Sequence, residues 1–337
     1  MRPVELKQFL KFAIPLRKKV LVCGPPGVGK TDIIKAGAAA AGNDLIITHP
    51  VIMEPTDIKG LPFPNGDHAV FLPYGQLKRI LEVKKPTVVF LDDIGTASTS
   101  VQASLMQLLH EGRIDDHKVP DQVVFLAATN RASDRSGVSG ILEAVKSRFD
   151  TIVNLDVNLD DWLEWANQNQ MPPELASFVR FRPEMLHQFV PSREIKNYPC
   201  PRTLAHVGGF LNDGLPKTLE FEVIMGAAGE SFAQEFTAFL TLSRKLPDPL
   251  KILTSPGSAP LFTKPDELYA ICGALAYHVS EETLPNLVTY INRIAPEYAV
   301  LTMRDVIARK PAMGVHLAYR QWLNQEGIKN IVMATAA

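Results

Sequence analysis

The segment Lys18–Ala40, KKVLVCGPPGVGKTDIIKAGAAA, gives the strongest indication of the fold. It opens with a compact apolar run, passes through a loop rich in glycine and proline, and continues with helical spacing. The loop, GPPGVGKT over Gly24–Thr31, has the spacing G-x-x-x-x-G-K-[ST] of a phosphate-binding loop, and its place between a strand and a helix makes the match specific. The alternative is a structural turn, but all eight residues and their context favour phosphate binding. We therefore expect the chain to bind a nucleotide.

Each residue type in this loop has a physical role in holding phosphate. Glycines let the backbone wrap around phosphate so that successive N–H groups point inward. The helix beginning near Lys30 adds the positive end of its dipole. Lys30 is expected to reach the β- and γ-phosphates, and the Thr31 hydroxyl to bind Mg²⁺. The predicted cofactors are ATP and Mg²⁺. The predicted nucleotide contacts are Gly24, Pro25, Pro26, Gly27, Val28, Gly29, Lys30, Thr31 and Asp32.

A second acidic motif follows 62 residues after the lysine, where the run VVFLDD ends in Asp92 and Asp93. Asp92 fits the role of a Walker-B aspartate, which holds Mg²⁺ directly or through water. Asp93 is expected to polarise the attacking water. Two adjacent acids at the end of a strand can also simply begin a turn. The phosphate loop upstream favours the catalytic interpretation.

Five short apolar runs, most of them rich in β-branched residues, lie in the first 155 residues. They lack clean alternation, which is typical of central strands in a parallel sheet that helices cover on both faces. The runs are Lys18–Cys23, Asp44–His49, Thr87–Asp93, Gln122–Thr129 and Thr151–Asp156. The helix candidates between them include Lys30–Ala41, Tyr74–Val83 and Ser100–His110. This alternation predicts an α/β P-loop NTPase fold with a doubly wound, parallel, five-stranded sheet.

The strand signal fades after about residue 158, and the remaining segments have helical spacing. We therefore predict a nucleotide-binding domain over 1–157, a helical lid over 158–245 and a C-terminal helical region over 266–337. The segment 246–265 between the last two is rich in proline, which predicts a linker or an extended strap.

Composition excludes several classes of protein. The chain has 337 residues, 46% hydrophobic and 21% charged, and a net charge of −1, so it can bury a sizeable core but lacks the basic excess usual for whole-chain nucleic-acid binding. Cys23, Cys200 and Cys272 are too few and too scattered for a disulfide framework. No apolar run approaches the ~18–20 residues of a membrane span, and the first residues lack a signal-peptide pattern. We therefore expect a cytoplasmic protein.

Taken together, these motifs resemble the AAA+ ATPases, and within them the MoxR-type branch of the helix-2-insert group. The match is good over about residues 18–156 and loose over 158–245, where CPRT at Cys200–Thr203 carries it. The segments that carry the resemblance are GPPGVGKTDII, THPVIMEPTDIKGLPF, FLDDIGTASTSVQASLMQLLHEGRI, FLAATNR and ILEAVKSRFD.

The resemblance implies roles for three more residues. Asn130 in AATNR resembles sensor 1, whose amide hydrogen-bonds the γ-phosphate or orients the attacking water. Arg148 in KSRFD resembles the arginine finger, which reaches the nucleotide of a neighbouring subunit. Arg202 in CPRT resembles the sensor-2 arginine of the lid. The alternatives are a solvated turn for Asn130, a surface salt bridge for Arg148 and a helix-capping neighbourhood for Arg202.

The sequence departs from the family pattern at two places. Asp93 stands where glutamate is usual, and its side chain is one methylene shorter, so hydrolysis could be slow. The run TNRASDRSG offers Arg131 and Arg135 as rival trans-acting arginines. It is also similar, with the spacing changed by one residue, to the GTP-using AAA+ subunit of a modification-dependent restriction enzyme, so GTP remains a second candidate nucleotide.

Two insertions lie where the resembling branch contacts its substrate or partner. Residues 53–73 occupy the position of the helix-2 insert, where Phe63, Phe71 and Tyr74 are candidate substrate contacts. The alternative is that these aromatic residues anchor a long loop to the core. Residues 111–122 occupy the position of a hairpin before sensor 1. The candidate ring-lining residues there are Arg113, His117 and Lys118, and the alternative is a solvated hairpin tip.

The resemblance implies a homo-oligomeric ring, six-membered in the family, that hydrolyses ATP to reshape or activate a protein substrate. A partner with a von Willebrand A domain is implied in the same way. Other functions stay open on the sequence: a nucleic-acid motor or loader, a GTP-using subunit, a nucleotide switch that hydrolyses slowly or not at all, and, weakest, a small-molecule kinase. Short basic clusters at Arg17–Lys19, Lys78–Arg79 and Lys84–Lys85 form no dense stripe, which disfavours the nucleic-acid motor.

Overall fold

The computed structural model describes residues 1–114, 117–134, 140–192 and 194–336. The chain divides into two compact units, Met1–Asn158 and Leu159–Ala337. We call them unit 1 and unit 2 and describe each by itself.

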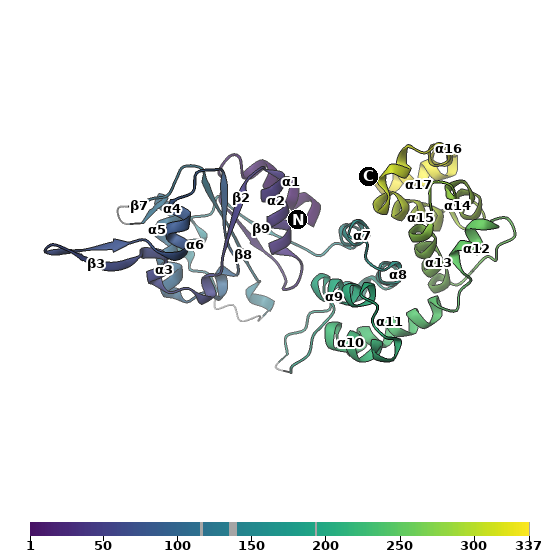
Figure 1. Cartoon of the computed structure of the whole chain (residues 1–337), viewed down its shortest axis with the longest axis horizontal. Coiled ribbons are helices and arrows are strands. Elements are labelled where there is room, and N and C mark those ends of the chain that lie inside the picture. Colours follow the sequence, from purple (N-terminus) through teal and green to yellow (C-terminus); the bar gives the residue numbers. More distant parts are fainter. Residues whose placement is uncertain (115–116, 135–139, 193, 337) are drawn as a thin grey trace. The chain divides into compact units, whose positions relative to one another are not determined.

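Unit 1 is built on a five-stranded sheet in which all neighbouring strands run parallel (Figure 1). From edge to edge its strands are β2 (Asp44–Thr48), β5 (Thr87–Leu91), β8 (Val123–Thr129), β1 (Val20–Cys23) and β9 (Thr151–Asn154). All five predicted runs form strands, so the fold class predicted from the sequence is confirmed. Strand β1 lies between β8 and β9, and its last residue, Cys23, is level with Thr129 and Asn154. The phosphate loop therefore leaves the sheet between the ends of two neighbouring strands.

Helices cover both faces of this sheet because alternate side chains of each strand point to opposite faces. One face packs against α1 (Pro3–Ala13) and α2 (Lys30–Ala40), with Val22, Phe90 and Leu126 in the shared core. The opposite face, with Leu21, Val89 and Phe125, packs against the remaining helices of the unit. Those helices are α3 (Pro55–Lys59), α4 (Gly75–Leu81), α5 (Thr99–Glu111) and α6 (Glu143–Lys146). Residues buried on both faces explain the continuous apolar runs of the sequence.

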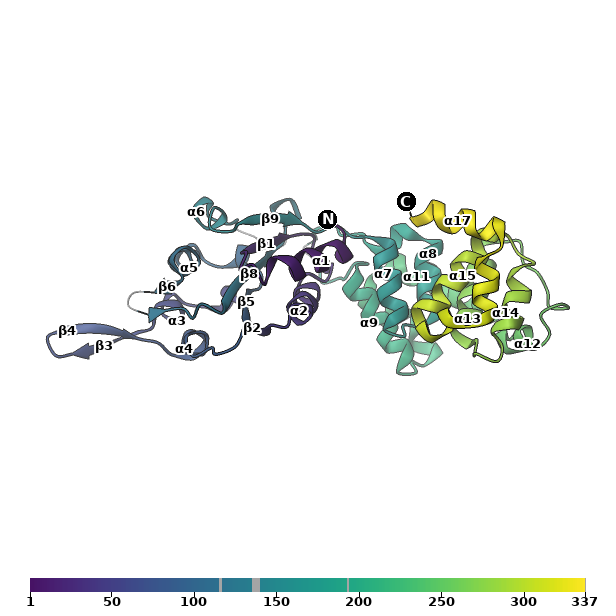
Figure 2. The ribbon, with the colours of Figure 1, turned by 90° about the horizontal axis from the view of Figure 1, so that it is seen from above.

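Two antiparallel hairpins extend from unit 1. The longer pairs β3 (Leu61–Asn65) with β4 (His68–Leu72) and projects well beyond the sheet, as two perpendicular views show (Figures 1 and 2). The shorter pairs β6 (Arg113–Ile114) with β7 (His117–Lys118). They occupy the two insertions predicted from the sequence.

Unit 2 is built from helices. They are α7 (Leu159–Gln168), α8 (Pro173–Phe181), α9 (Pro201–Asn212), α10 (Glu220–Ala228), α11 (Glu230–Ser243), α12 (Pro249–Thr254), α13 (Pro265–His278), α14 (Leu284–Ile291), α15 (Pro296–Arg309), α16 (Leu317–Leu323) and α17 (Glu326–Ala336). The segments predicted as a lid and as a C-terminal region lie within this one unit. Helix α13 packs against α8 and against α15, which joins the two segments.

The prediction of an extended linker over 246–265 is wrong for its first half. Asp248 accepts a hydrogen bond from the Leu250 amide, which caps the start of α12, and Pro249 fits the first helical turn. Ile252 and Leu253 are buried in one core with helices α13 to α16. The prolines therefore begin and end a short packed helix. In the described part of the chain, no helix is both long enough and apolar enough to cross a membrane.

Candidate functional site

The phosphate loop lies at the carboxyl edge of the parallel sheet, between β1 and α2. Gly29 has a φ of 89°, a left-handed conformation that favours glycine, and it directly precedes the first turn of α2. Gly24 is required for a different reason. A Cβ atom there would lie 2.9 Å from the Leu155 carbonyl oxygen, so the loop and the end of β9 approach closely only without a side chain. The sequence therefore builds a concave backbone at a helix N-terminus.

Lys30 and Asn130 meet inside this loop. The Lys30 side chain is buried, and its ammonium donates to the carbonyl oxygens of Gly24 and Pro25 at 3.0 and 2.9 Å. It also donates to Asn130 Oδ1 at 2.5 Å, across 100 residues of sequence. The structure thus brings together the predicted Walker-A lysine and the predicted sensor-1 asparagine. A bound phosphate would offer Lys30 stronger, charged acceptors in place of these neutral oxygens.

Thr31 and Asp92 form the predicted metal-binding pair. The Thr31 hydroxyl donates to Asp92 Oδ2 at 2.9 Å, and Asp92 is 8% exposed. Among the residues that the structure describes, no group of three or more His, Cys, Asp or Glu side chains could hold a metal. Mg²⁺ binds through one or two protein oxygens and takes its other ligands from phosphate and water, so the Thr31 hydroxyl and the Asp92 carboxylate suit it. This pair and a bound triphosphate would together satisfy the ion.

Asp93 follows Asp92 after the end of β5 and has an unusual backbone conformation. Its φ and ψ are 54° and 42°, a left-handed geometry that aspartate tolerates better than most residues. Its carbonyl oxygen accepts from both the amide and the hydroxyl of Thr96, which fixes the backbone. The backbone geometry of the predicted water-polarising residue is therefore set by the turn that follows β5.

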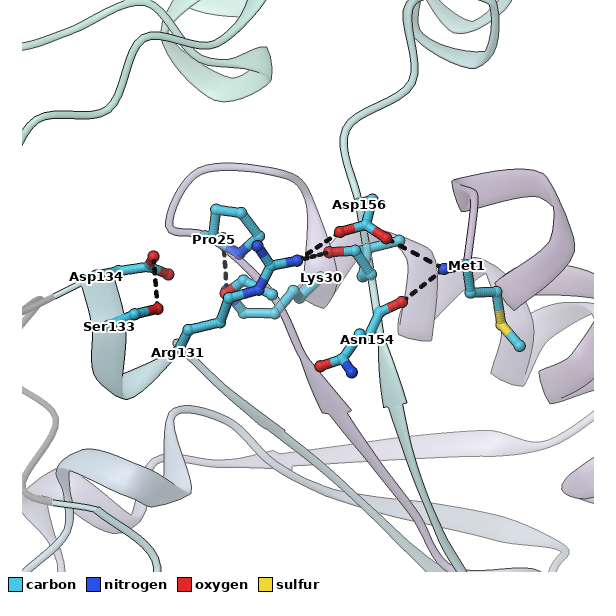
Figure 3. Close-up of polar contacts among 10 residues, drawn as sticks. Met1, Pro25, Lys30, Arg131, Ser133, Asp134, Asn154 and Asp156 are labelled. Carbon is cyan, nitrogen blue, oxygen red and sulfur yellow. Dashed lines mark hydrogen bonds and ion pairs between the residues drawn. The ribbon is translucent and has the colours of Figure 1, made fainter.

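Arg131 is bound within its own chain. Its guanidinium donates to the Leu155 carbonyl oxygen at 3.1 Å and to Asp156 Oδ1 at 2.5 Å (Figure 3). Burial raises the pKa of Asp156, but hydrogen bonds from Arg131 and from the Met1 amino group outweigh it and lower that pKa overall. This geometry does not favour Arg131 as a trans-acting arginine. The other rival, Arg135, lies outside the described residues.

Sequence reasoning missed Asp156 and Asp134 as members of this site. A signal for Asp156 was present, since an acid directly after the last strand must lie at the same sheet edge as the residues after β8. Asp134 lies close enough to affect Cys23, the residue before the loop. Burial raises the pKa of the Cys23 thiol, the charges of Arg131 and Lys30 oppose that rise, and Asp134 adds to it. The thiol is therefore held in its neutral form at physiological pH.

Arg148 lies at the opposite edge of the sheet from its own phosphate loop. It lies three residues before β9, and nearby Asp150 accepts from the Lys19 amide at 2.8 Å, ahead of β1. The Arg148 guanidinium donates to the Ser147 hydroxyl at 2.8 Å, and its buried Nε has no hydrogen-bond partner within the described residues. Arg148 thus lies away from the phosphate loop of its own chain, and its role as an arginine finger stays a prediction.

Arg202 belongs to unit 2, near the start of α9, and is exposed. The helix start is fixed by its neighbours: the Cys200 amide donates to Thr203 Oγ1 at 2.9 Å. Cys200 itself is buried. The sensor-2 role of Arg202 stays a prediction.

The β3–β4 hairpin presents apolar side chains to solvent. Phe63 is 57% exposed and Phe71 is 39% exposed, so these two residues do not anchor the insert to the core. Tyr74 does anchor it, because its hydroxyl donates to Asp57 Oδ1 at 2.6 Å. The two hairpins also touch, since His117 Nε2 lies 2.9 Å from the Phe71 carbonyl oxygen. Two of the three predicted aromatic contacts are thus available to a partner.

The outer edge of β3 is protected against strand addition. Pro62 and Pro64 occupy alternate positions of the strand, paired with Phe71 and Ala69. Proline has no N–H, so it fits a ladder only where its nitrogen faces away from the partner strand. The outward-facing positions of β3 therefore offer no donor to an incoming strand. We therefore expect any contact on this side of the hairpin to be made by side chains.

Comparison with known proteins agrees with this geometry. Residues 19–149 match the family model of the AAA domain, dynein-related subfamily. These residues, less than half of the chain, are thus similar to an AAA domain. A transcription regulator of anaerobic nitric oxide reductase, NorR from Serratia proteamaculans, is 29% identical over 143 residues, which is 40% of this chain and 28% of that protein. The proteasome-activating nucleotidase of Saccharolobus islandicus is 33% identical over 134 residues, which is 36% of this chain and 31% of that protein.

The chain thus spans less than a third of the length of these two relatives. Midasin from Giardia intestinalis is 28% identical over 181 residues, which is 50% of this chain and 4% of that protein. Among solved structures, a mutant of RuvB from Thermotoga maritima is 16% identical, with 84% of each chain covered and a TM-score of 0.42.

Proposed function

We propose that this protein is a ring-forming ATPase of the MoxR-type branch, which uses ATP hydrolysis in the cytoplasm to reshape or activate a protein substrate. The observation that carries the proposal is the cluster of Lys30, Thr31, Asp92 and Asn130 at the carboxyl edge of the sheet. Lysine, hydroxyl, carboxylate and amide converge there on the concave loop, which is the arrangement that phosphoryl transfer to water requires.

Each residue of the cluster has a separate role in the proposed hydrolysis. Lys30 exchanges its protein acceptors for phosphate oxygens, and Asn130 is released to orient water or the γ-phosphate. Thr31 and Asp92 would hold Mg²⁺, which would supply positive charge to the phosphates. Asp93 polarises the attacking water. Arg148 of a neighbouring subunit offsets the charge that develops on the transferred group.

The hairpin supports a protein substrate over a nucleic acid. Residues 60–77 include no lysine or arginine, whereas nucleic-acid binding depends on cations that neutralise phosphates. Exposed Phe63 and Phe71 suit apolar segments of a polypeptide instead. A six-membered ring and a partner with a von Willebrand A domain follow from the family resemblance alone. Asp93 supports a second candidate, a switch that binds ATP and hydrolyses it slowly, because its carboxylate is short and its backbone is fixed.

Mixing two inactive variants tests the proposal. Lys30→Ala removes the phosphate contact but keeps Arg148, and Arg148→Ala does the reverse. Each alone is expected to lose turnover by at least about tenfold, and their mixture is expected to recover part of it because each subunit supplies what its neighbour lacks. Arg79→Ala, at an exposed arginine on α4, is the matched control and should stay active.

Absence of recovery in rings that demonstrably mix would contradict the trans site. Running GTP in parallel decides the nucleotide. Tight ATP binding without turnover in the wild type would favour the switch.

A further inference from the structure

The Arg131 side chain crosses over the start of the phosphate loop. Arg131 follows β8 and Asp156 follows β9, while β1 lies between these strands. Neighbouring strands are about 4.8 Å apart, so this pair bridges about 10 Å at the carboxyl edge. Figure 3 shows Arg131 reaching toward Asp156, with Pro25 and Lys30 of the loop close by. We call the contacts of Arg131 with Leu155 and Asp156 the latch.

The latch holds backbone that touches the nucleotide site directly. The Leu155 carbonyl oxygen, which accepts from Arg131, lies so close to Gly24 that any Cβ there would be only 2.9 Å away. The Leu155 amide donates to the Cys23 carbonyl oxygen at 2.7 Å. The end of β9 is therefore held from two sides, by the backbone of the phosphate loop and by Arg131.

The other end of the latch is next to the predicted sensor. Asn130, the neighbour of Arg131, accepts the 2.5 Å hydrogen bond from Lys30. A phosphate that draws the Lys30 ammonium away would leave Asn130 Oδ1 without this donor, and Arg131 is the next residue in the chain. On the far side, Asp156 lies two residues before the boundary between the units, which falls after Asn158. A continuous set of contacts thus runs from the lysine to the connection with unit 2.

We propose that Arg131 is a positioning residue that transmits the state of the nucleotide to the chain connection entering unit 2. This rests on the proposed function, since it requires a triphosphate at Lys30. Asp156 also faces the Met1 amino group, at 3.4 Å, and that amino group donates to the Asn154 carbonyl oxygen at 2.8 Å. Arg131 is the partner that links Asp156 to the sensor loop.

Hydrogen exchange of the nucleotide-free full chain tests the latch itself. Arg131→Met is expected to raise the exchange rate of amides within 155–159 about tenfold, because the segment loses its side-chain anchor. Lys18→Met removes a comparable exposed ion pair, that with Asp150 at 3.4 Å, at the other edge of the sheet, and should leave 155–159 unchanged. Equal exchange at 155–159 in the wild type and Arg131→Met would overturn the latch.

Energy transfer tests transmission without added protein labels. All three tryptophans, Trp162, Trp165 and Trp322, belong to unit 2, so transfer to a mant-labelled nucleotide in unit 1 depends on the distance to unit 2. In the wild type, transfer to mant-ADP and to a mant-labelled non-hydrolysable ATP analogue should differ. In Arg131→Met this difference should vanish, while the Kd of each nucleotide changes by no more than about threefold.

A persistent difference in Arg131→Met would overturn transmission. Asp156→Asn decides the question if Arg131→Met fails to bind nucleotide, since this variant keeps the arginine and weakens only the ion pair. Asp156→Asn should reduce the difference in energy transfer between the two nucleotides. A difference as large as that of the wild type would overturn the proposal. A wild type that binds neither analogue contradicts the proposed function and transmission together, whereas hydrogen exchange still reports separately on the latch.

Discussion

A buried ion pair in unit 2 yields the sharpest stability prediction. Asp305 on α15 accepts from Arg180 on α8 at 2.6 and 2.7 Å, with both terminal guanidinium nitrogens engaged. It also accepts from the Asn167 amide on α7 at 2.8 Å. The two charged side chains are 10% and 5% exposed. Burial alone lowers the pKa of Arg180, but the charge and hydrogen bonds of Asp305 outweigh it and raise that pKa.

The expected loss in the free energy of unfolding follows from the groups that Asp305→Asn leaves unpaired. The guanidinium stays buried without its counter-charge, and removing one partner of a buried pair costs about 3–5 kcal/mol. The amide keeps the size of the side chain and can still accept a hydrogen bond, so we expect a loss of about 3 kcal/mol. With a urea m-value of about 2–3 kcal/mol/M, the unfolding midpoint falls by about 1–1.5 M.

Urea unfolding detected by tryptophan fluorescence is the assay, because every tryptophan lies in unit 2. Asp160→Asn is the matched control. Asp160 pairs with Arg304 on the same helix α15 at 3.2 Å, but the two side chains are 53% and 51% exposed, so the loss should stay below about 1 kcal/mol. A loss below about 1 kcal/mol for Asp305→Asn would refute the argument that this pair ties the predicted lid to the C-terminal helices.

Three further predictions concern single side chains. Gly24→Ala should destabilise unit 1 by about 1–3 kcal/mol in calorimetry, since the added Cβ meets the Leu155 backbone; unchanged stability would mean that this contact is not close. Burial raises the pKa of Cys272 from 9.0 to about 11, because the folded protein disfavours the thiolate. The contribution of this thiol to the free energy of unfolding is therefore intact below pH 9 and falls by about 3 kcal/mol as the pH rises to about 11. In urea unfolding between pH 9 and 10, the free energy of unfolding should fall less in Cys272→Ala than in the wild type. An equal fall in the wild type and the variant would contradict this. Phe63→Ser should change the free energy of unfolding by less than about 0.5 kcal/mol because the ring is exposed. Tyr74→Phe should lower the free energy of unfolding more than Phe63→Ser does, because it loses the hydrogen bond to Asp57. A large effect at Phe63 would favour the anchoring alternative.

The sheet and the phosphate loop were predictable because their signals are local. Each strand is a short apolar run, and the loop motif is contiguous over Gly24–Thr31. Asn130 was predicted through the family resemblance, and its place near Lys30 agrees with the rule that parallel strands end at one edge. The strands and the loop can therefore be recognised with few long-range contacts.

Contacts between distant segments were not predictable in the same way. Asp305 and Arg180 are 125 residues apart, and their pairing depends on how α8 and α15 pack. The latch between Arg131 and Asp156 needed the knowledge that β1 lies between β8 and β9. The proline-rich segment was predicted as a linker or an extended strap, but proline is also common at the first position of a helix, where Pro249 lies. In each case tertiary packing decided what composition left open.

ATP turnover per protomer, measured over a wide range of protein concentration, tests most directly whether the ATPase site is completed between subunits. The rate should rise with concentration as rings assemble, and this rise should be lost in Arg148→Ala. A measurable rate that stays flat across concentrations where light scattering shows monomers becoming oligomers would contradict it.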